Sequence, residues 1–294
     1  MRRWNGLKTA VLLGALSALM LVAGYAIAGG SGLAVAALLS LAMNGAAYFW
    51  SDRLALRAMG ARRVGEWEAP TLVATVRELS DAAGVPMPKV YISPLPQPNA
   101  FATGRDPRHA AVCVTEGILR LLTWRELRAV LAHEMSHVVN RDILVSSVAA
   151  GLAGVITSLA NFAFFLPVGG DDEDAPNPLA TLVMLVLAPV AAALIQLAIS
   201  RTREFEADAD GAELADDPLA LAAALQKIEA GVHSAPLVST PATTANAHLM
   251  IANPLADDGL GGLFRTHPPT SQRVRRLLEL ADERRDHRRP ASIR

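Results

Sequence analysis

Four long apolar runs constrain what this chain can fold into more than any other feature of its sequence. They cover residues 9–28, 33–50, 143–168 and 179–200, and they gather the hydrophobic residues, 52% of the 294 positions, into blocks. An α-helix needs about 20 predominantly apolar residues to cross the hydrocarbon core of a bilayer. Each run is near or above that length, so the sequence predicts four transmembrane helices arranged as two hairpins.

The first two runs predict a hairpin near the N-terminus. A cleaved signal peptide is the alternative, since Arg2 and Arg3 precede the first run. That run is too long for the apolar core of a signal peptide, and a second run follows after a few residues. Gly29–Gly32 supply a turn, and the second run ends in Tyr48-Phe49-Trp50, which is typical of an aromatic anchor at the membrane interface.

Basic residues around the runs predict the orientation, because the cytoplasmic flanks of membrane helices carry an excess of Lys and Arg. They lie before the first run, after the second and after the fourth, whereas residues 169–174 between the third and fourth runs contain no basic residue. These residues are Arg2, Arg3, Lys8, Arg53, Arg57, Arg62, Arg63, Arg201 and Arg203. We therefore expect both termini and the polar segments on the cytoplasmic side.

The third and fourth runs have a second interpretation, a pair of buried helices in a large soluble core. Several polar residues make the third run less apolar than a typical membrane anchor, although small and polar residues also suit helix packing inside a membrane bundle. They are Ser146, Ser147, Thr157, Ser158 and Asn161. Asn44 in the second run could support packing in the same way or mark the end of that run.

His133-Glu134-Met135-Ser136-His137 predicts a metal site on a helix. Residues four apart lie on one face of a helix, about 6 Å apart along its axis, so two imidazoles can bind one zinc ion. The glutamate between them can take a proton from the attacking water. Thr123 and Glu126 indicate a capping box that begins this helix. Apolar residues follow at helical spacing at Leu127, Val130, Leu131 and Val138.

A zinc ion held by two histidines needs a third protein ligand and an open position for water. The acidic segment 201–212 follows the fourth run directly, and a hairpin would return it close to the end of the histidine helix. Glu204 and Asp208 are four apart, so one can bind the metal while the other orients a histidine ring. Spacing alone does not separate Glu204 from Glu206 or Asp208 as the ligand. The alternative is a solvated helix start that pairs with neighbouring arginines.

The polar segments predict a small mixed set of helices and strands. A helix is expected over residues 71–83, closed by glycine and proline, and a short strand over 89–92. Residues 99–103 and 109–114 are expected to pair as strands across a turn that contains Gly, Asp and Pro. The predicted fold class is α+β, mostly α-helical, with four transmembrane helices and a cytoplasmic domain that contains a small β-sheet.

The predicted domain organisation is one soluble domain interrupted by a membrane hairpin. Residues 1–52 form the first transmembrane hairpin and 53–142 the first part of the catalytic domain. Residues 143–200 form the second hairpin, and 201–294 complete the catalytic domain with the third metal ligand. Neither polar segment is an obvious independent domain, because the metal site draws on both.

Composition excludes several other classes of function. The net charge of −1 gives no basic surface for nucleic acid, so we expect no nucleic-acid partner. The single cysteine, Cys113, excludes an intramolecular disulfide framework. It lies in an alternating apolar run and is interpreted as a buried strand residue. A catalytic thiol is the alternative, but no His or Asn marks it as one.

The chain resembles the HtpX-type heat-shock proteases, which are membrane-bound gluzincins in the same broad group as the CAAX prenyl proteases of the Ste24 type. Four motifs carry the resemblance, and they occur in the family's order over nearly the whole chain. They are Asn99–Gly104, His133–His137, Arg203–Asp208 and Thr266–Pro269. One departure is the Asn-Arg-Asp of residues 140–142, where the family leads us to expect something nearer Asn-Gly-Asp.

The resemblance implies a zincin-like catalytic domain with one zinc ion per chain. Its ligands would be His133, His137 and Glu204, with Glu134 as the general base and Asp208 as a supporting residue. An edge strand beside the cleft would bind substrate as an added strand through main-chain hydrogen bonds. That strand comprises Asn99, Ala100, Phe101 and Ala102.

The resemblance also implies that His267 lies near the metal and helps to hold the oxyanion, with Arg273 as a further candidate for a supporting role. The alternative for His267 is structural, since His-Pro-Pro could simply begin the helix expected from Thr270.

The implied function is hydrolysis of peptide bonds in unfolded or damaged proteins at the cytoplasmic face of a bacterial inner membrane. Three alternatives remain at this stage. An intramembrane protease would need its zinc motif inside an apolar run, whereas arginines flank this one on both sides. A membrane scaffold with a vestigial zinc site would not need Glu134. A CAAX-type prenyl-protein protease resembles a larger chamber with more membrane helices. The sequence leaves the substrates and the oligomeric state open.

Overall fold

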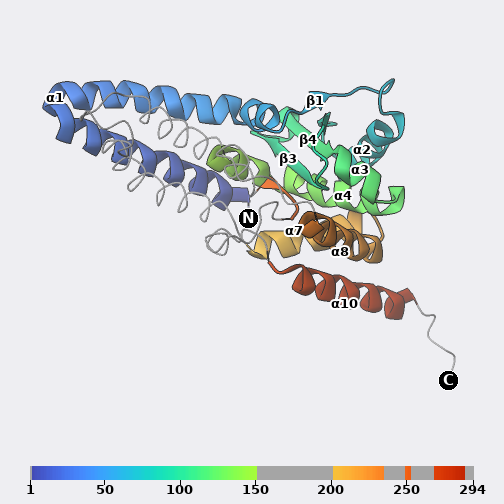
Figure 1. Cartoon of the computed structure of the whole chain (residues 1–294). Coiled ribbons are helices and arrows are strands. Elements are labelled where there is room, and N and C mark those ends of the chain that lie inside the picture. The colour runs from blue at the N-terminus through green and yellow to red at the C-terminus, as the bar shows by residue number, and fades with distance from the viewer. Residues whose placement is uncertain (1, 151–200, 235–248, 253–267, 289–294) are drawn as a thin grey trace.

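A computed structural model describes residues 2–150, 201–234, 249–252 and 268–288 of the chain. These residues are mostly helical, with one four-stranded mixed sheet, which confirms the predicted α+β class at that level (Figure 1). The labelled helices are α1 (Arg2–Ala58), α2 (Pro70–Ala83), α3 (Glu116–Leu121), α4 (Trp124–Asn140), α7 (Arg201–Leu214), α8 (Pro218–Ser234) and α10 (Thr270–Arg288). Residues 142–150 are helical as well. The strands are β1 (Arg62–Arg63), β2 (Lys89–Ser93), β3 (Ala100–Gly104) and β4 (Ala110–Thr115).

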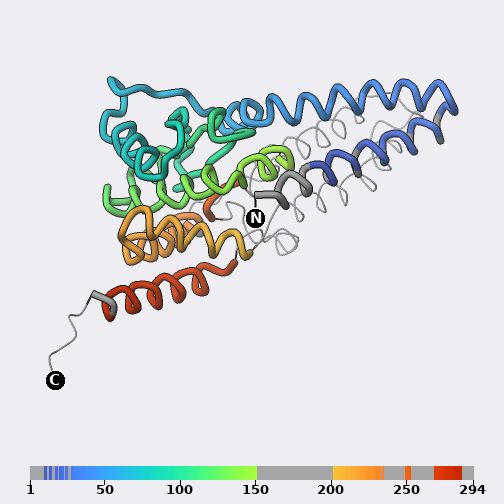
Figure 2. The backbone as a smooth tube through the Cα atoms, turned by 180° about the vertical axis from the view of Figure 1, so that it is seen from behind, coloured from blue at the N-terminus to red at the C-terminus, as the bar shows by residue number. Residues whose placement is uncertain are grey.

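Helix α1 is a hairpin of two helical arms, as the sequence predicted. The backbone leaves helical geometry at Ala28 and Gly29, and the positive φ of 58° at Gly29 is one that glycine adopts without strain. The arms lie side by side in both views (Figures 1 and 2). Across them, Asn44 Nδ2 donates to Ser17 Oγ at 2.7 Å, and Ser40 Oγ donates to the same oxygen at 2.8 Å. Asn44 is therefore a packing residue rather than the marker of a helix end.

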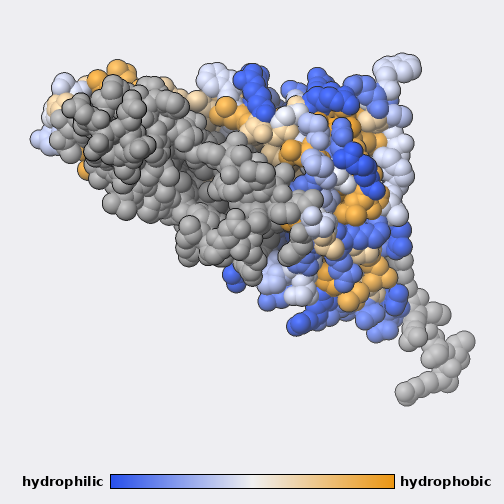
Figure 3. Space-filling model, viewed as in Figure 1, coloured by the Kyte–Doolittle hydropathy of each residue, from blue (hydrophilic) through white to orange (hydrophobic). Residues whose placement is uncertain are grey.

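The surface of α1 is apolar where it leaves the rest of the molecule. Within the described ranges, one helical segment, Ala28–Ala58, is long and apolar enough to cross a membrane. In the view of Figure 3, most of the hydrophilic surface lies on the globular end of the molecule, away from the apolar arms of α1. The four predicted spans are not confirmed, because most of the third run and all of the fourth fall outside the described residues. Large exposed apolar residues on the second arm include Leu33, Val35, Leu38, Leu39, Leu41, Phe49 and Trp50.

The sheet has the strand order β1-β2-β4-β3. Strands β2 and β4 are parallel, with Tyr91 opposite Cys113, whereas β3 pairs antiparallel with β4, with Phe101 opposite Cys113. The predicted strands are confirmed within a residue or two, and the predicted turn contains the short 3-10 helix Pro107–His109. Strand β1 was not predicted, because a strand of two residues is too short to show an alternation of apolar and polar side chains. Strand β3 lies at one edge of the sheet, beside α4.

Helix α4 is the centre of the soluble part. It packs against β3 and α2 on one side and against α7 and α8 on the other, and α10 covers α7 and α8 (Figure 1). The predicted capping box is present, since Thr123 Oγ1 accepts from the Glu126 N–H and the Glu126 carboxylate accepts from the Thr123 N–H.

Helices α3 and α8 were not predicted. Cys113 is fully buried and free, as expected of a strand residue.

Gly211 allows α7 to lie unusually close to α4. A Cβ atom added at this glycine would lie 2.7 Å from the Cα of His133 and 2.8 Å from its backbone nitrogen. Positions 204, 208 and 211 recur at helical spacing, so this contact brings the acidic residues of α7 onto the histidine face of α4. Cross-helix bonds reinforce it, because Ser136 Oγ donates to the Ala207 carbonyl at 3.2 Å.

The Gly211→Ala variant is expected to lose about 1–3 kcal/mol of folding stability, because the methyl group meets backbone that cannot rotate away. Thermal unfolding of the purified protein in detergent would measure this, and its metal content should fall as well. Gly65→Ala is the matched control, since its added Cβ meets no atom within 4 Å. Equal unfolding temperatures for wild type and Gly211→Ala would contradict the close approach.

Candidate metal centre

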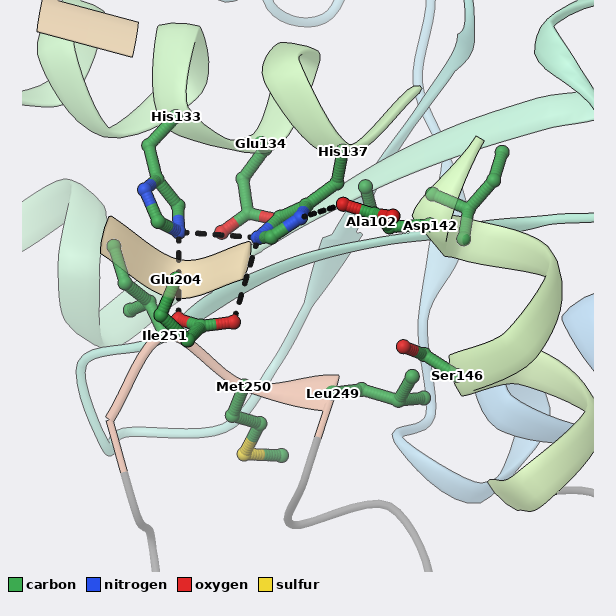
Figure 4. Close-up of a pocket in the computed structure, with 11 residues that line it drawn as sticks. Ala102, His133, Glu134, His137, Asp142, Ser146, Glu204, Leu249, Met250 and Ile251 are labelled. Atoms are coloured by element: carbon green, nitrogen blue, oxygen red, sulfur yellow. Dashed lines mark hydrogen bonds and ion pairs between the residues drawn. The ribbon is translucent and has the colours of Figure 1, made fainter. Parts of the chain in front are cut away.

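His133, His137 and Glu204 converge on one point between α4 and α7. Each offers one ligand atom, and these atoms lie within 4.8 Å of one another (Figure 4). The two Nε2 atoms are 3.3 Å apart, and the Glu204 oxygens lie 3.9 Å from His133 Nε2 and 3.7 Å from His137 Nε2. Of the three acidic residues that sequence spacing left open, Glu204 is the one that joins the two histidines in this cluster.

These separations suit a small metal ion. Atoms bound to zinc at about 2.0–2.1 Å in tetrahedral geometry lie roughly 3.3–3.4 Å apart. The separation of the two Nε2 atoms, 3.3 Å, falls in that range. The two Glu204 oxygens, each measured to a different histidine, lie up to about half an ångström beyond it. Two imidazoles with one carboxylate are a donor set typical of catalytic zinc, which keeps a fourth position open for water or substrate.

Glu134 points into the same site from the next position on α4. It is 2% exposed, and the backbone N–H of Ala102 on β3 bonds to its carboxylate. Burial raises the pKa of Glu134, although His133 and His137 oppose that shift. A buried carboxylate with a raised pKa beside a metal site has the properties of a general base that later returns its proton.

Asp208 supports His133, and Arg273 supports Asp208. Asp208 Oδ1 lies 3.0 Å from His133 Nδ1. Arg273 from α10 donates two hydrogen bonds to the same carboxylate, at 2.8 and 2.7 Å. Burial raises the pKa of Asp208, but Arg273 and His133 outweigh it and lower the pKa to about 2. Asp208 is therefore ionised at neutral pH and able to orient the ring.

Asp142 supports His137 in the same way, and the sequence reasoning missed it. Its Oδ2 atom lies 3.4 Å from His137 Nδ1. Helix α4 ends at Asn140. The left-handed backbone of the next residue, Arg141 (φ 58°, ψ 30°), turns the chain so that Asp142 folds back onto the helix. This is the position where the family pattern favours glycine, which adopts that conformation without strain. Burial lowers the pKa of His137, but Asp142 and Glu204 raise it to about 9.

The outer edge of β3 is already bonded to another part of the chain. The Ile251 N–H donates to the Ala100 carbonyl at 3.1 Å, and Asn99 Nδ2 donates to the Ala252 carbonyl at 3.1 Å. Arg273 Nη1 donates to the Ile251 carbonyl at 2.9 Å. We call residues 249–252 the cover segment. It crosses in front of the metal centre and presents Leu249 and Met250 there (Figure 4).

The cavity that remains between the cover segment and the metal centre is about 30 Å³. That volume holds about one water molecule. Residues from α4, β3, α7 and the cover segment line it together with Asp142, Ile143 and Ser146. In this arrangement the cover segment also occupies the Ala100 carbonyl at the edge of β3.

Residues 66–281, most of the chain, match Peptidase family M48. The chain belongs to peptidase family M48. This confirms the resemblance drawn from the four sequence motifs. Membership of M48 makes the chain a peptidase that works with a metal, and with the α1 hairpin we describe it as a membrane metalloprotease.

Several M48 relatives match almost end to end. A protease HtpX homolog of Kineococcus radiotolerans is 53% identical over 97% of this chain and 99% of its own length. Homologs from Paenarthrobacter aurescens and Paraburkholderia phytofirmans are 54% and 49% identical, over 94% and 95% of this chain and 96% and 98% of theirs. The crystal structure of S. mikatae Ste24p aligns with a TM-score of 0.49 and 17% identity, over 93% of this chain and 64% of that one.

Most site residues predicted for an M48 peptidase come together in the structure. His133, His137, Glu204, Glu134 and Asp208 share one centre. The predicted strand residues Asn99, Ala100, Phe101 and Ala102 lie beside it, and all four are buried. His267 lies outside the described residues, so its predicted role stays a prediction. Arg273 has a supporting contact, as its candidacy suggested, whereas Asp142 and the cover segment were missed.

Proposed function

We propose that this chain is a zinc metalloendopeptidase that hydrolyses peptide bonds in unfolded or damaged proteins at the cytoplasmic face of a bacterial inner membrane. The convergence of His133, His137 and Glu204 beside the buried Glu134, in a chain of family M48, is the observation that carries the proposal. A scaffold with a vestigial metal site would have no use for that buried carboxylate.

The proposed reaction assigns each residue one task. His133, His137 and Glu204 would hold one zinc ion, which when bound supplies Lewis-acid polarisation of water and of a carbonyl. Glu134 takes the proton from the attacking water and delivers it to the leaving amine, which its raised pKa favours. Asp208 and Asp142 fix the imidazole rings through Nδ1. His267 remains the proposed helper that stabilises the oxyanion.

The proposed substrate path runs along β3. An extended peptide would add to the edge formed by Asn99–Ala102 through main-chain hydrogen bonds. The Ala100 carbonyl faces this edge and now accepts from Ile251, so a substrate amide would take the place of the Ile251 N–H. Binding as an added strand depends on the backbone of the substrate rather than on its side chains, which suits the varied sequences of damaged proteins.

The proposed topology keeps the predicted division at residues 52, 142 and 200, with two membrane hairpins and a cytoplasmic catalytic domain. The exposed apolar surface of Ala28–Ala58 supports the first hairpin. Cysteines introduced at Arg63 and at Gly169 would test it in cells with a membrane-impermeant maleimide. Labelling of Gly169→Cys from outside, with Arg63→Cys protected, is expected, and the reverse pattern would refute the orientation.

Metal removal is expected to abolish cleavage of casein by the purified enzyme, and zinc is expected to restore it. The Glu204→Gln variant should bind zinc at least 10-fold more weakly, because it replaces a charged ligand with a neutral amide. Glu206→Gln is the matched control on the same helix and should bind zinc like the wild type. Equal zinc loss in both variants would refute Glu204 as the ligand.

Zinc affinity is also expected to depend on pH. The raised pKa of about 9 means that His137 carries a proton in the metal-free protein at neutral pH. Because zinc must displace that proton, affinity should rise with pH until about 9 and level off above it. Isothermal titration in buffers of different ionisation enthalpy would count the protons released. A zinc affinity that stays constant between pH 6 and pH 9 would contradict this prediction.

A further inference from the structure

Each histidine of the metal centre is backed first by a carboxylate and then by an arginine. On one side, Arg273 donates two hydrogen bonds to Asp208, at 2.8 and 2.7 Å. On the other side, Asp142 Oδ2 lies 3.4 Å from His137 Nδ1, and Asp142 Oδ1 lies 3.7 Å from Nη1 of Arg203. The series His137, Asp142, Arg203 therefore repeats the series His133, Asp208, Arg273 in residue type and order.

The guanidinium of Arg203 is buried, and its hydrogen-bonding capacity is incompletely used. The residue is 8% exposed, and its Nε and Nη1 atoms have no hydrogen-bond partner within the part of the chain that the structure describes. A buried charge is costly unless it is paired. Asp142 is 6% exposed and lies just beyond hydrogen-bonding distance of Nη1.

We propose that Arg203 is a positioning residue, which holds Asp142 and through it the His137 ring in the orientation that binds the metal. The proposal rests on the proposed zinc site. In this arrangement His137 binds through Nε2, its Nδ1–H donates to Asp142, and the guanidinium of Arg203 holds that carboxylate in place. Arg203 touches neither metal nor substrate, and it acts through Asp142.

The place of the pair in the chain gives it a second consequence. Asp142 follows the C-terminal end of α4, and Arg203 lies in the first turn of α7. Residues 143–200, the predicted second hairpin, separate the two in sequence. The pair therefore joins both ends of that insertion next to a metal ligand. Arg203 also immediately precedes Glu204, so one turn of α7 supplies a ligand for the metal and support for another.

The test uses the full-length protein in detergent and measures metal binding rather than cleavage. Asp142→Asn and Arg203→Met are each expected to weaken zinc binding by about 10–100-fold, the usual effect of losing an outer partner of a ligand. Both should also change the visible absorption spectrum of the Co²⁺-substituted protein, which reports ligand geometry. Arg203→Lys keeps the charge and should recover part of the affinity. The double variant should lose little more than Asp142→Asn alone, because the two residues act in series.

Arg201→Met is the matched control, since Arg201 is exposed on the same turn of α7. It should leave zinc affinity and the Co²⁺ spectrum unchanged. Wild-type zinc affinity and spectrum in both Asp142→Asn and Arg203→Met would overturn the proposal, even if unfolding temperatures fall. If Arg203→Met does not fold, Arg203→Lys and Asp142→Asn decide the matter by the same readouts. Failure of the wild type itself to bind zinc would instead refute the proposed function.

Discussion

Glu134→Gln is expected to lower cleavage of casein by about 10²–10⁴-fold, the contribution typical of a positioned general base. The amide has nearly the shape of the carboxylate but cannot accept the proton of the attacking water. His133, His137 and Glu204 are untouched, so zinc content should remain at one ion per chain. Initial rates of cleavage together with metal analysis of the same sample would measure both quantities.

Glu126→Gln is the matched control for this variant. Glu126 lies on the same helix and is 8% exposed, but it belongs to the capping box and the ion pair with Lys227. Glutamine also serves in a capping box, so this change should leave cleavage within a few-fold of wild type. Substantial cleavage by the Glu134→Gln protein, with a normal zinc content, would exclude Glu134 as the base.

Arg273→Met is expected to reduce the free energy of unfolding by about 3–5 kcal/mol, because it leaves the buried carboxylate of Asp208 without its partner. Arg273 is 1% exposed and also donates to the Ile251 carbonyl, so the cover segment should loosen as well. Arg284→Met on the same helix is the control. Its ion pair with Asp216 is partly exposed, so its loss should cost about 1 kcal/mol or less.

The stability lost in Arg273→Met is expected to depend on pH. In the wild type, the pKa of Asp208 is lowered from 3.8 to about 2, so its carboxylate contributes stability above pH 3.8 that is lost as the pH falls towards 2. Without Arg273 that contribution is absent, and the difference between the two proteins should shrink across the same interval. Denaturant unfolding at several pH values would show this. A difference that grows on acidification would contradict the assigned pairing.

Local signals in the sequence predicted the elements that local physics determines. The capping box at Thr123 places the start of α4, and helical spacing places His133 and His137 on one face. The glycine-rich turn places the bend of α1 at Gly29. Sequence spacing left Glu204 as one of three candidates for the third metal ligand. Spacing shows which residues share a helix face, but it does not show which other helix that face contacts.

What the sequence could not show depends on residues that are distant in the chain. Arg273 and Asp208 are 65 positions apart in the sequence, and Ile251 and Ala100 are about 150 positions apart. No periodic pattern of residues indicates either contact. The role of Asp142 could be predicted from the sequence, because residues 140–142 depart from the family pattern at Arg141. A non-glycine residue at a helix end that turns left-handed could have indicated that the next side chain folds back.

The cover segment means that every incoming substrate faces a competitor from within the same molecule. A tethered competitor acts at an effective concentration on the order of millimolar or above, which a dilute peptide in free solution does not reach. A chain held at the same membrane as the enzyme would be concentrated by that shared attachment in the same way. An enzyme regulated in this way would leave scarce, soluble neighbours intact and would cleave chains that accumulate at the bilayer, without needing any recognition sequence.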